Sequence, residues 1–245
     1  MCVTCGCGED TKHDHHHEHG HDHSHHHDNV ISLEADILAE NNRFADQNRK
    51  LFKSKHVLAL NLVSSPGSGK TTLLEETIRK LSSKSKISVI EGDQHTELDA
   101  KRIRNSGASA YQINTGKACH LDGHMVGHAL EHLDIESGSY VFIENVGNLI
   151  CPALFDLGEH AKIVLVSVTE GEDKPLKYPD MFIGAELVII TKTDLLPYLK
   201  FDLEKCIANI QKINSKSKII PLSVENGNGL ADWLDWLTIA HKFYT

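Results

Sequence analysis

The sequence predicts an α/β fold in which a mostly parallel β-sheet is covered by helices on both faces. The first observation is a series of short apolar runs at 57–63, 87–90, 140–143, 163–168, 187–190 and 218–223, with a weaker run at 109–114. The second is that helical patterns lie between most of these runs, an alternation typical of parallel sheets. The 245 residues suffice for one such domain of about 190–200 residues plus appendages.

The chain begins with a tail, MCVTCGCGEDTKHDHHHEHGHDHSHHHD, in which ten of the fifteen positions from His13 to His27 are histidine. Residues 8–28 contain almost nothing apolar, so we expect the tail to be disordered. Neutral imidazoles bind nickel, zinc and copper, and the His13–His27 tract is therefore predicted to bind metal. The alternatives are a purification tag and a merely solvating tail. Acidic residues interrupt the histidines, and a tag would not begin with C-x2-C-x-C.

The three cysteines of the tail form a separate candidate site. Cys2, Cys5 and Cys7 can close on one ion, and Gly6 allows the backbone to turn tightly between the last two. A fourth ligand is needed, and the terminal amine is the nearest candidate. Such a sulfur and nitrogen set suits planar nickel or tetrahedral zinc, and the motif does not choose between them.

Charge and hydropathy exclude several classes of protein. The formal net charge is −9, of which the 28-residue tail carries −5 and the remainder only −4, so no basic footprint for nucleic acid is present. No apolar run is long enough for a signal peptide or a membrane span. We therefore expect a cytoplasmic protein with reduced cysteines, which favours metal binding over disulfides.

The segment 32–55 follows the tail and predicts a polar, weakly amphipathic helix. Its apolar residues, which could lie on the folded body, are Leu33, Ile37, Phe44, Leu51 and Phe52. We accordingly divide the chain into a metal-binding tail (1–28), a linker with this helix (29–55) and a nucleotide-binding domain (56–245).

The segment SSPGSGKTT (64–72) lies between the first strong strand and a helix, as a phosphate-binding loop requires. Backbone N–H groups around Gly67 and Gly69 would surround the phosphates, Lys70 would reach the β- and γ-phosphates, and Thr71 would bind Mg²⁺. Ser64 replaces the leading glycine of the G-x4-G-K-S/T pattern. The predicted contacts are Gly67, Ser68, Gly69, Lys70, Thr71 and Thr72.

The segment TKTD (191–194) predicts that the base is guanine. Asp194 can accept two hydrogen bonds, from the guanine N1–H and the exocyclic amine, a donor pair that adenine lacks. Lys192 can pack its stem along the base. The loop SVENGNG (223–229) would complete the pocket through backbone groups of Ser223, Val224 and Glu225.

Acidic residues follow two more strands. Asp93 lies in IEGDQ and Glu144 in FIENVGN, and either can hold Mg²⁺ or its waters, while Gly147 can offer its N–H to the γ-phosphate. The predicted catalytic set is Lys70, Thr71, Asp93 and Glu144. The alternative is that both acids are ordinary solvated loop residues. We do not include Glu91 in this set.

A second metal site is predicted from TGKACHLDGHMVGHALEHLD, which follows the strand at 109–114. Cys119 and His120 are expected at the start of a helix, where a thiolate is favoured. If the strands preceding them and Cys151 are neighbours, these three residues converge. They would leave a coordination position open, or be completed by a second subunit.

The remaining histidines and cysteines are weaker candidates for metal ligands. His120, His124, His128 and His132 repeat every four residues, so that successive pairs share a helix face. We consider His124 and His128 a possible auxiliary site and expect His132 to be solvated. The sequence does not decide whether His95 is a metal ligand. Cys206 lies inside a predicted helix and is expected to be a buried apolar residue.

With these motifs in place the chain resembles the HypB family, GTPases that deliver nickel during maturation of nickel–iron hydrogenases. The resemblance covers nearly the whole length and is most specific in CVTCGC, the His-rich tract, SSPGSGKTT, EGDQ, GKACHLDGH, ENVGNLICP and TKTDLLP. It implies a P-loop GTPase fold and a strong nickel site at Cys2, Cys5 and Cys7. It also implies a weaker nickel or zinc site at Cys119, His120 and Cys151, at the interface of a GTP-dependent homodimer.

The resemblance further implies slow GTP hydrolysis to GDP, with a HypA-like nickel protein and the hydrogenase large subunit as partners. Two other functions stay open. A urease-type nickel-insertion GTPase shares the GTPase core, but the motifs C-x2-C-x-C and GKACHLDGH with Cys151 argue against it. A nickel or zinc storage protein would explain the tail but not the intact GTPase motifs.

Overall fold

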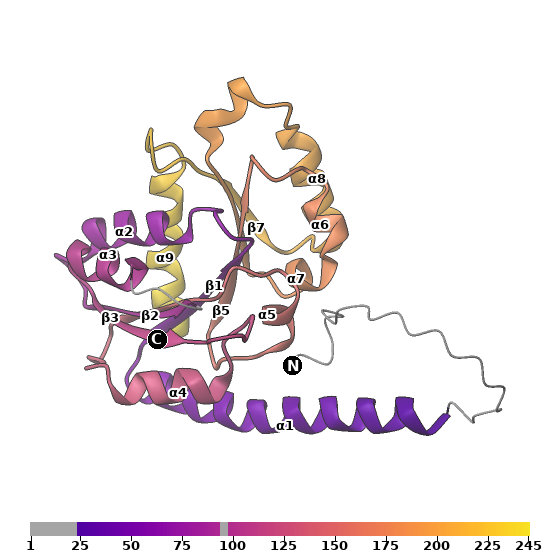
Figure 1. Ribbon diagram of the computed structural model, residues 1–245. Helices are drawn as coiled ribbons and strands as arrows, with labels where there is room; N and C mark the ends of the chain where they lie inside the picture. The colour runs from indigo at the N-terminus through magenta and orange to yellow at the C-terminus, as the bar shows by residue number, and fades with distance from the viewer. Residues whose placement is uncertain (1–23, 94–97) are drawn as a thin grey trace. The chain divides into compact units, whose positions relative to one another are not determined.

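The computed structural model describes residues 24–93 and 98–245, with side chains from residue 35 onward. The chain forms two compact units, Met1–Glu40 and Asn41–Thr245. The described part of the first unit is helical, and the second unit holds the sheet (Figure 1). The compact unit with the sheet begins at Asn41, inside the N-terminal helix.

Within the described residues, seven strands form one sheet in the order β3-β2-β4-β1-β5-β6-β7. The strands are β1 (Leu58–Ser64), β2 (Ile87–Asp93), β3 (Ser109–Asn114), β4 (Tyr140–Glu144), β5 (Ala161–Ser167), β6 (Leu187–Thr191) and β7 (Lys218–Pro221). All neighbouring pairs are parallel. The predicted fold class and all seven apolar runs are therefore confirmed.

Most of the helices lie between successive strands, whereas α1 precedes β1 and α9 follows β7. They are α1 (Ser24–Ser54), α2 (Lys70–Leu81), α3 (Leu98–Ser106), α4 (Gly123–Glu131), α5 (Cys151–Leu154), α6 (Lys174–Lys177), α7 (Pro179–Ile183), α8 (Leu203–Ile213) and α9 (Leu230–Tyr244), with a 3₁₀ helix, η1, at Thr193–Tyr198. Figure 1 shows α2, α3 and α9 beside one another, α4 along another side, and α6, α7 and α8 grouped together.

Alternation along the central strand explains why both faces are covered. In β1, Leu58, Leu60 and Leu62 belong to the apolar cluster that includes helices α2 and α9. Ala59 belongs instead to the cluster of α1 and α4 residues. Successive side chains of a strand point to opposite faces, so a strand that is apolar throughout needs a helical layer on each side.

The N-terminal helix begins earlier than predicted, at Ser24 rather than at residue 32. From Asn41 onward it packs on the body, where Phe52 is fully buried while Ile37, before this stretch, is 48% exposed. Asn48 donates from Nδ2 to the carbonyl oxygens of Gly123 (2.8 Å) and Leu157 (3.0 Å). Buried amide groups, not only the apolar residues of the pattern, therefore attach this helix.

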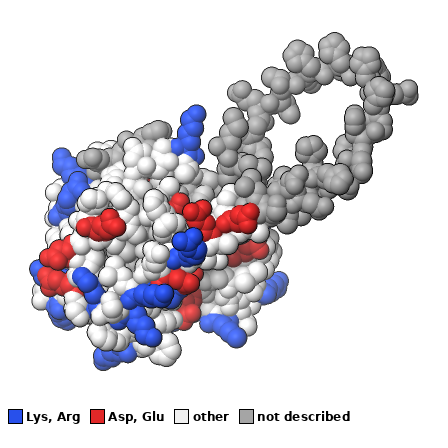
Figure 2. Space-filling model, turned by 90° about the horizontal axis from the view of Figure 1, so that it is seen from below, with Lys and Arg blue, Asp and Glu red and all other residues white. Residues whose placement is uncertain are grey.

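The charges of the described surface are mixed. Basic and acidic side chains are interspersed over the face seen in Figure 2. This agrees with the near-neutral charge of the chain outside the tail. No helix in the described part of the chain is both long and apolar enough to cross a membrane.

Candidate nucleotide and metal sites

The phosphate loop lies between β1 and α2, at the carboxyl end of the central strand. Gly67 and Gly69 adopt φ angles of 73° and 98°, a left-handed conformation that other residues rarely adopt. Lys70 donates from Nζ to Ser64 Oγ at 2.9 Å, and the Ser68 hydroxyl also donates to this oxygen. The Ser64 hydroxyl is thus an acceptor inside the loop, which gives the residue replacing the leading glycine a structural role.

A cavity of about 540 Å³ opens beside this loop, which is within the usual size range of small-molecule sites. Its lining includes the six predicted phosphate contacts, which are Gly67, Ser68, Gly69, Lys70, Thr71 and Thr72, together with Asp93, Glu144 and Gly147. It adds Glu91, Asp99 and Arg102. The structure therefore brings the carboxyl ends of β1, β2 and β4 together, where ligands of open α/β sheets bind.

The predicted magnesium residues meet within this cavity. Thr71 donates from Oγ1 to Glu144 Oε1 at 2.7 Å. The second carboxylate oxygen, Oε2, is buried and has no hydrogen-bond partner among the described residues. Burial raises the pKa of Glu144, and the positive charge of Lys70 opposes that shift. A buried acceptor without a donor is a group that a cation would satisfy.

Glu91 is a site residue that the sequence analysis missed. It is only 2% exposed, and its Cα pairs with that of Glu144 across β2 and β4. Burial, and then the negative charge of Glu144, raise the pKa of Glu91 well above its usual value. A signal was present, because both acids directly follow four-residue apolar runs, ISVI and YVFI, so that parallel pairing in register aligns them.

This pair predicts a pH-dependent stability of the protein without nucleotide and Mg²⁺. Because the folded state raises the pKa of Glu91, it binds the proton more tightly than the unfolded state does. The stabilisation that this proton provides is complete below the pKa of Glu91 in the unfolded chain. It is lost as the pH rises through the pKa of Glu91 in the folded protein. We expect Glu91→Gln, which cannot ionise, to raise the free energy of unfolding at pH 7.5 by about 1–3 kcal/mol.

Urea unfolding at pH 5 and pH 7.5 measures this effect. The matched control is Glu136→Gln, at a side chain that is 51% exposed, and it should change stability by less than about 0.5 kcal/mol at either pH. If Glu91→Gln destabilised the protein at pH 7.5 as much as at pH 5, the two carboxylates would not repel each other in the folded state.

Gly147 lies against the phosphate loop. A Cβ atom at this position would lie 2.9 Å from the Pro66 Cα, which real side chains do not tolerate. The loop after β4 therefore contacts the loop after β1 through bare backbone. This contact leaves the Gly147 backbone next to the phosphate cavity, which it lines.

The predicted base-binding residues surround a second cavity of about 290 Å³. It is lined by Ser68, Gly69, Thr72, Thr191, Lys192, Asp194, Leu195, Leu222, Val224 and Glu225. Lys192 has a left-handed backbone and donates from Nζ to the Gly67 carbonyl at 2.7 Å. The buried Ser223 donates its hydroxyl to Asp194 Oδ1 and so orients that carboxylate rather than lining the cavity itself.

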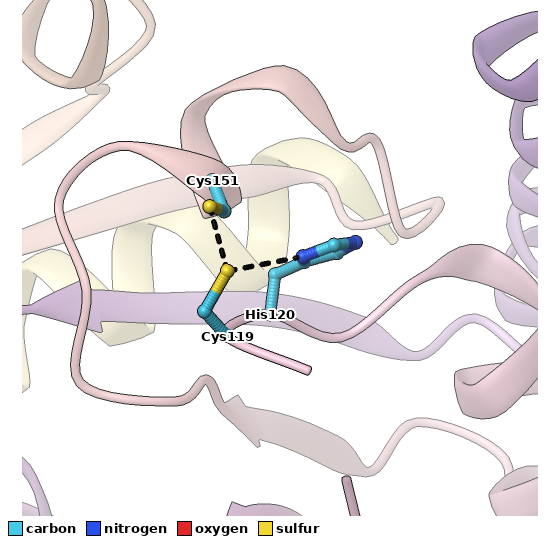
Figure 3. Close-up of side chains that lie close together, drawn as sticks. All are labelled: Cys119, His120 and Cys151. Carbon is cyan, nitrogen blue, oxygen red and sulfur yellow. Dashed lines mark hydrogen bonds between the residues drawn. The ribbon is translucent and has the colours of Figure 1, made fainter. Parts of the chain in front are cut away.

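Cys119, His120 and Cys151 converge in a third site (Figure 3). The two sulfur atoms lie 2.7 Å apart, without a disulfide, and Cys119 Sγ is 3.8 Å from His120 Nδ1. All the ligand atoms lie within 4.8 Å of one another. Tetrahedral bonds to zinc imply ligand separations of roughly 3.5–3.8 Å, so small adjustments would allow one ion to contact all three.

The route by which these residues meet differs from the predicted one. Strands β3 and β4 are not neighbours, because β2 lies between them. The loop after β3 instead crosses the end of β2 at Gly92, where a Cβ would lie 2.9 Å from Leu121 side-chain atoms. Leu121 then donates its backbone N–H to Asn145 Oδ1, in the loop after β4. A residue without a side chain at the end of β2 is what lets the loop pass.

The expected helix start at Cys119 and His120 is also wrong. Helix α4 begins at Gly123, and Asp122 is its N-cap, accepting a hydrogen bond from Met125 N at 2.7 Å. Cys119 and His120 therefore lie in the preceding loop, without the support of a helix N-terminus. His120 stacks on Phe155 at 3.9 Å between ring centroids, and burial lowers its pKa, which favours the neutral ligand form.

Some of the other candidate metal ligands lie outside the described residues, and the rest have defined surroundings. Cys2, Cys5, Cys7 and His95 lie outside the described residues, and so does the side chain of every histidine in the His13–His27 tract. His124 packs against Phe44 (4.8 Å between ring centroids), whereas His128 lies 4.8 Å from His132. Cys206 is fully buried, as predicted, and burial raises its pKa to about 12.

Known proteins resemble this chain in sequence and in fold. Residues 58–221 match the family "CobW/HypB/UreG, nucleotide-binding domain". The chain is 56% identical to hydrogenase maturation factor HypB of Azotobacter vinelandii, over 85% of this chain and 69% of that protein. It is 54% identical to HypB of Escherichia coli K12, over 85% of this chain and 72% of that protein.

Two solved structures resemble the chain closely. HypB from Archaeoglobus fulgidus is 42% identical with a TM-score of 0.79, over 83% of this chain and all of the other. HypB from Helicobacter pylori, solved in complex with nickel, is 38% identical with the same TM-score, over 84% and 97%. Sequence and fold agree, and the chain belongs to the HypB family of hydrogenase maturation factors, within the CobW/HypB/UreG nucleotide-binding proteins.

Proposed function

We propose that this protein is a GTP-hydrolysing nickel metallochaperone that delivers nickel to the large subunit of a nickel–iron hydrogenase. The observation that carries the proposal is the short path between its two sites. Glu144 and Gly147 line the phosphate cavity, and Cys151 of the metal cluster lies only four residues beyond Gly147. The names of its relatives, and the nickel in the Helicobacter pylori structure, support this assignment.

The nucleotide chemistry would follow from the residues of the phosphate cavity. Lys70 would stabilise charge on the β- and γ-phosphates, and Asp194 would select guanine. Thr71, Glu144 and Asp93 would hold Mg²⁺, which neutralises charge on the phosphates when bound. The buried, unsatisfied Oε2 atom of Glu144 and the hydroxyl of Thr71 form an all-oxygen donor set, which suits this ion. We expect hydrolysis to be slow.

The metal is the cargo, and Cys119, His120 and Cys151 would hold it. Two thiolates and an imidazole suit nickel and zinc alike, and three ligands leave a position for a partner group. A second copy of the chain in a GTP-dependent homodimer would complete the coordination. Cys2, Cys5, Cys7 and the His13–His27 tract would bind further nickel ahead of transfer. The partners would be a HypA-like nickel protein and the hydrogenase large subunit, in the cytoplasm.

Nucleotide and metal binding should be coupled through the Gly147–Cys151 segment. A γ-phosphate at Gly147 must move the chain that leads to Cys151, while Cys119 and His120 lie on another loop. We expect a GTP analogue to change nickel affinity about 5–150-fold relative to GDP, with a reciprocal effect of nickel on nucleotide affinity.

A nickel titration tests this coupling in a chain without residues 1–28, so that the tail does not mask the weaker site. The unit Asn41–Thr245 remains whole in this variant. The control is the same titration of Cys151→Ala, in which the nucleotide effect should disappear. Equal nickel affinities with GDP and with the analogue would refute the coupling. They would also remove the main reason to prefer nickel delivery over nickel storage.

Nickel delivery to urease is a second candidate. A relative from Helicobacter hepaticus, 41% identical over 84% of this chain, is named a hydrogenase/urease maturation factor. The two candidates separate in a strain that contains both enzymes. Deletion of the gene should abolish hydrogenase activity, with recovery in excess nickel, and a role in both pathways would lower urease activity as well.

A further inference from the structure

We infer that Asn41 and Asn48 of helix α1 are positioning residues of the metal site. That site draws Cys119 and His120 from one loop and Cys151 from another segment. The inference rests on the proposed nickel function and adds two residues outside the ligand set. Both asparagines are buried, with 5% and 4% of their surface exposed, and both belong to the unit that holds the sheet. They lie seven residues, nearly two helical turns, apart, so their side chains share one face of α1.

Gly123 is the point at which α1 holds the loop that carries His120. Asn41 Oδ1 accepts a hydrogen bond from Gly123 N at 2.7 Å, and Asn48 donates from Nδ2 to Gly123 O at 2.8 Å. The helix thus binds both backbone groups of one residue. Gly123 follows His120 by only three residues, so that little chain separates this anchor from the metal ligand.

The same two amides hold the segment that follows Cys151. Asn41 donates from Nδ2 to Asp156 O at 2.8 Å, and Asn48 donates from Nδ2 to Leu157 O at 3.0 Å. Each asparagine therefore bridges the two segments that carry the metal ligands. Loss of either amide should loosen one segment against the other.

Both segments also lie directly on the backbone of α1. A Cβ atom at Gly123 would lie 2.8 Å from Ala45 N, and one at Gly158 would lie 2.8 Å from Asn48 Cβ. No side chain of either glycine separates the helix from the two segments. The anchors are consequently short and leave the segments little freedom to shift.

The anchors affect the metal site because the backbone sets where each ligand atom lies. Phe155 directly precedes the Asp156 carbonyl that Asn41 binds, and its ring stacks on His120. Buried carbonyl oxygens that lose their donors cost free energy, so the two segments should move when an amide is removed. Residues that orient metal ligands without contacting the ion commonly contribute about 10–100-fold to metal affinity.

The test asks how close the two thiols are held before any metal is added. It uses the full-length chain with the three tail cysteines replaced, Cys2→Ser, Cys5→Ser and Cys7→Ser. Equilibration with defined ratios of reduced and oxidised glutathione gives the effective concentration of the Cys119 and Cys151 thiols. In this exchange the two protein thiols form one disulfide, while one oxidised glutathione is reduced to two molecules of glutathione.

Asn48→Leu removes the amide and keeps a side chain of similar shape, and leucine is a good helix former, so α1 itself should persist. We expect the effective thiol concentration to fall about tenfold or more. In the same variant nickel should dissociate about tenfold faster or more, followed by loss of the thiolate-to-nickel absorption in the presence of a chelator. Asn41→Leu should act in the same direction.

The matched control is Asn209→Leu on α8. Asn209 is 3% exposed and donates from Nδ2 to Glu172 O at 2.8 Å, so this variant loses a buried amide hydrogen bond at neither ligand-bearing segment. It should change the effective thiol concentration by less than about twofold, because distant sites act independently. Nucleotide affinity measured without nickel shows whether each variant is folded.

The inference is overturned if Asn41→Leu and Asn48→Leu change the effective thiol concentration no more than Asn209→Leu does. This measurement involves no metal, so it can fail while the nickel function stands. The opposite result is equally distinct. If Cys151→Ala left nickel affinity unchanged while Asn48→Leu still lowered the effective thiol concentration, the nickel assignment would be wrong and the two asparagines would still hold the segments together.

Discussion

Asp194→Asn should weaken GTP binding by about 3–5 kcal/mol, roughly 10²–10³-fold or more, because a charged acceptor for two guanine donors is lost. Ser223 holds the Asp194 carboxylate in the base cavity through a hydrogen bond to Oδ1, so the loss should not be recovered by another orientation. The same variant should bind xanthosine triphosphate better, since xanthine has a carbonyl where guanine has its amine. Competition between GTP and xanthosine triphosphate for a fluorescent nucleotide measures both changes.

The control for this specificity change is Asp235→Asn, at an exposed position of α9. It removes the same charge from the chain without touching the cavity and should leave both affinities unchanged. If Asp194→Asn bound GTP as tightly as the native protein does, the segment TKTD would have no role in base recognition. Guanine selectivity would then have to arise elsewhere in the 290 Å³ cavity.

Cys151→Ala should lower nickel affinity at the converged site by at least about 10²-fold, since even residues that only support metal ligands contribute 10–100-fold. The remaining pair, Cys119 and His120, are sequence neighbours and offer two ligands instead of three. Loss of the thiolate-to-nickel absorption in a chain without residues 1–28 measures the change. Nucleotide affinity in the presence of a chelator should be retained, which shows that the variant is folded.

Cys206→Ala is the matched cysteine control. Cys206 is fully buried on α8, and burial raises its pKa to about 12, so it offers no thiolate at neutral pH. Its replacement should lower stability by about 1 kcal/mol and leave nickel affinity unchanged. Equal nickel affinities for Cys151→Ala and Cys206→Ala would mean that the metal is held by other residues.

The sequence predicted the layers of the fold because local patterns determine them. Apolar runs such as LALNLV and LVII are buried in the sheet, and the helical stretches between them carry one apolar face. The phosphate loop was equally readable, since its strand, glycines, lysine and helix are contiguous. The segment TKTD, which is predicted to bind the base, was readable for the same reason, because its residues are contiguous. Each of these features depends on residues that are close together in the chain.

The sequence was less informative wherever separate segments meet. The sequence linked the convergence of Cys119 and Cys151 to neighbouring strands, and the structure brings them together although the strands before them are not neighbours. Only the strand order, with β2 between β3 and β4, shows that the loop must cross at Gly92. The position of Glu91 in the cavity likewise depends on the register that aligns it with Glu144.

The histidines of α4 show the same division between local and tertiary information. Their four-residue spacing predicts that successive pairs share a face and makes His124 and His128 the candidate auxiliary site, but it does not show which rings each histidine contacts. Phe44 of α1 packs against His124, and Tyr111 of β3 supports His128 and His132. Local patterns in the sequence predict the fold class, the phosphate loop and the residues proposed to bind guanine and metal. The tertiary structure decided which distant side chains share a site, because strand order, register and packing bring together residues that no local pattern connects.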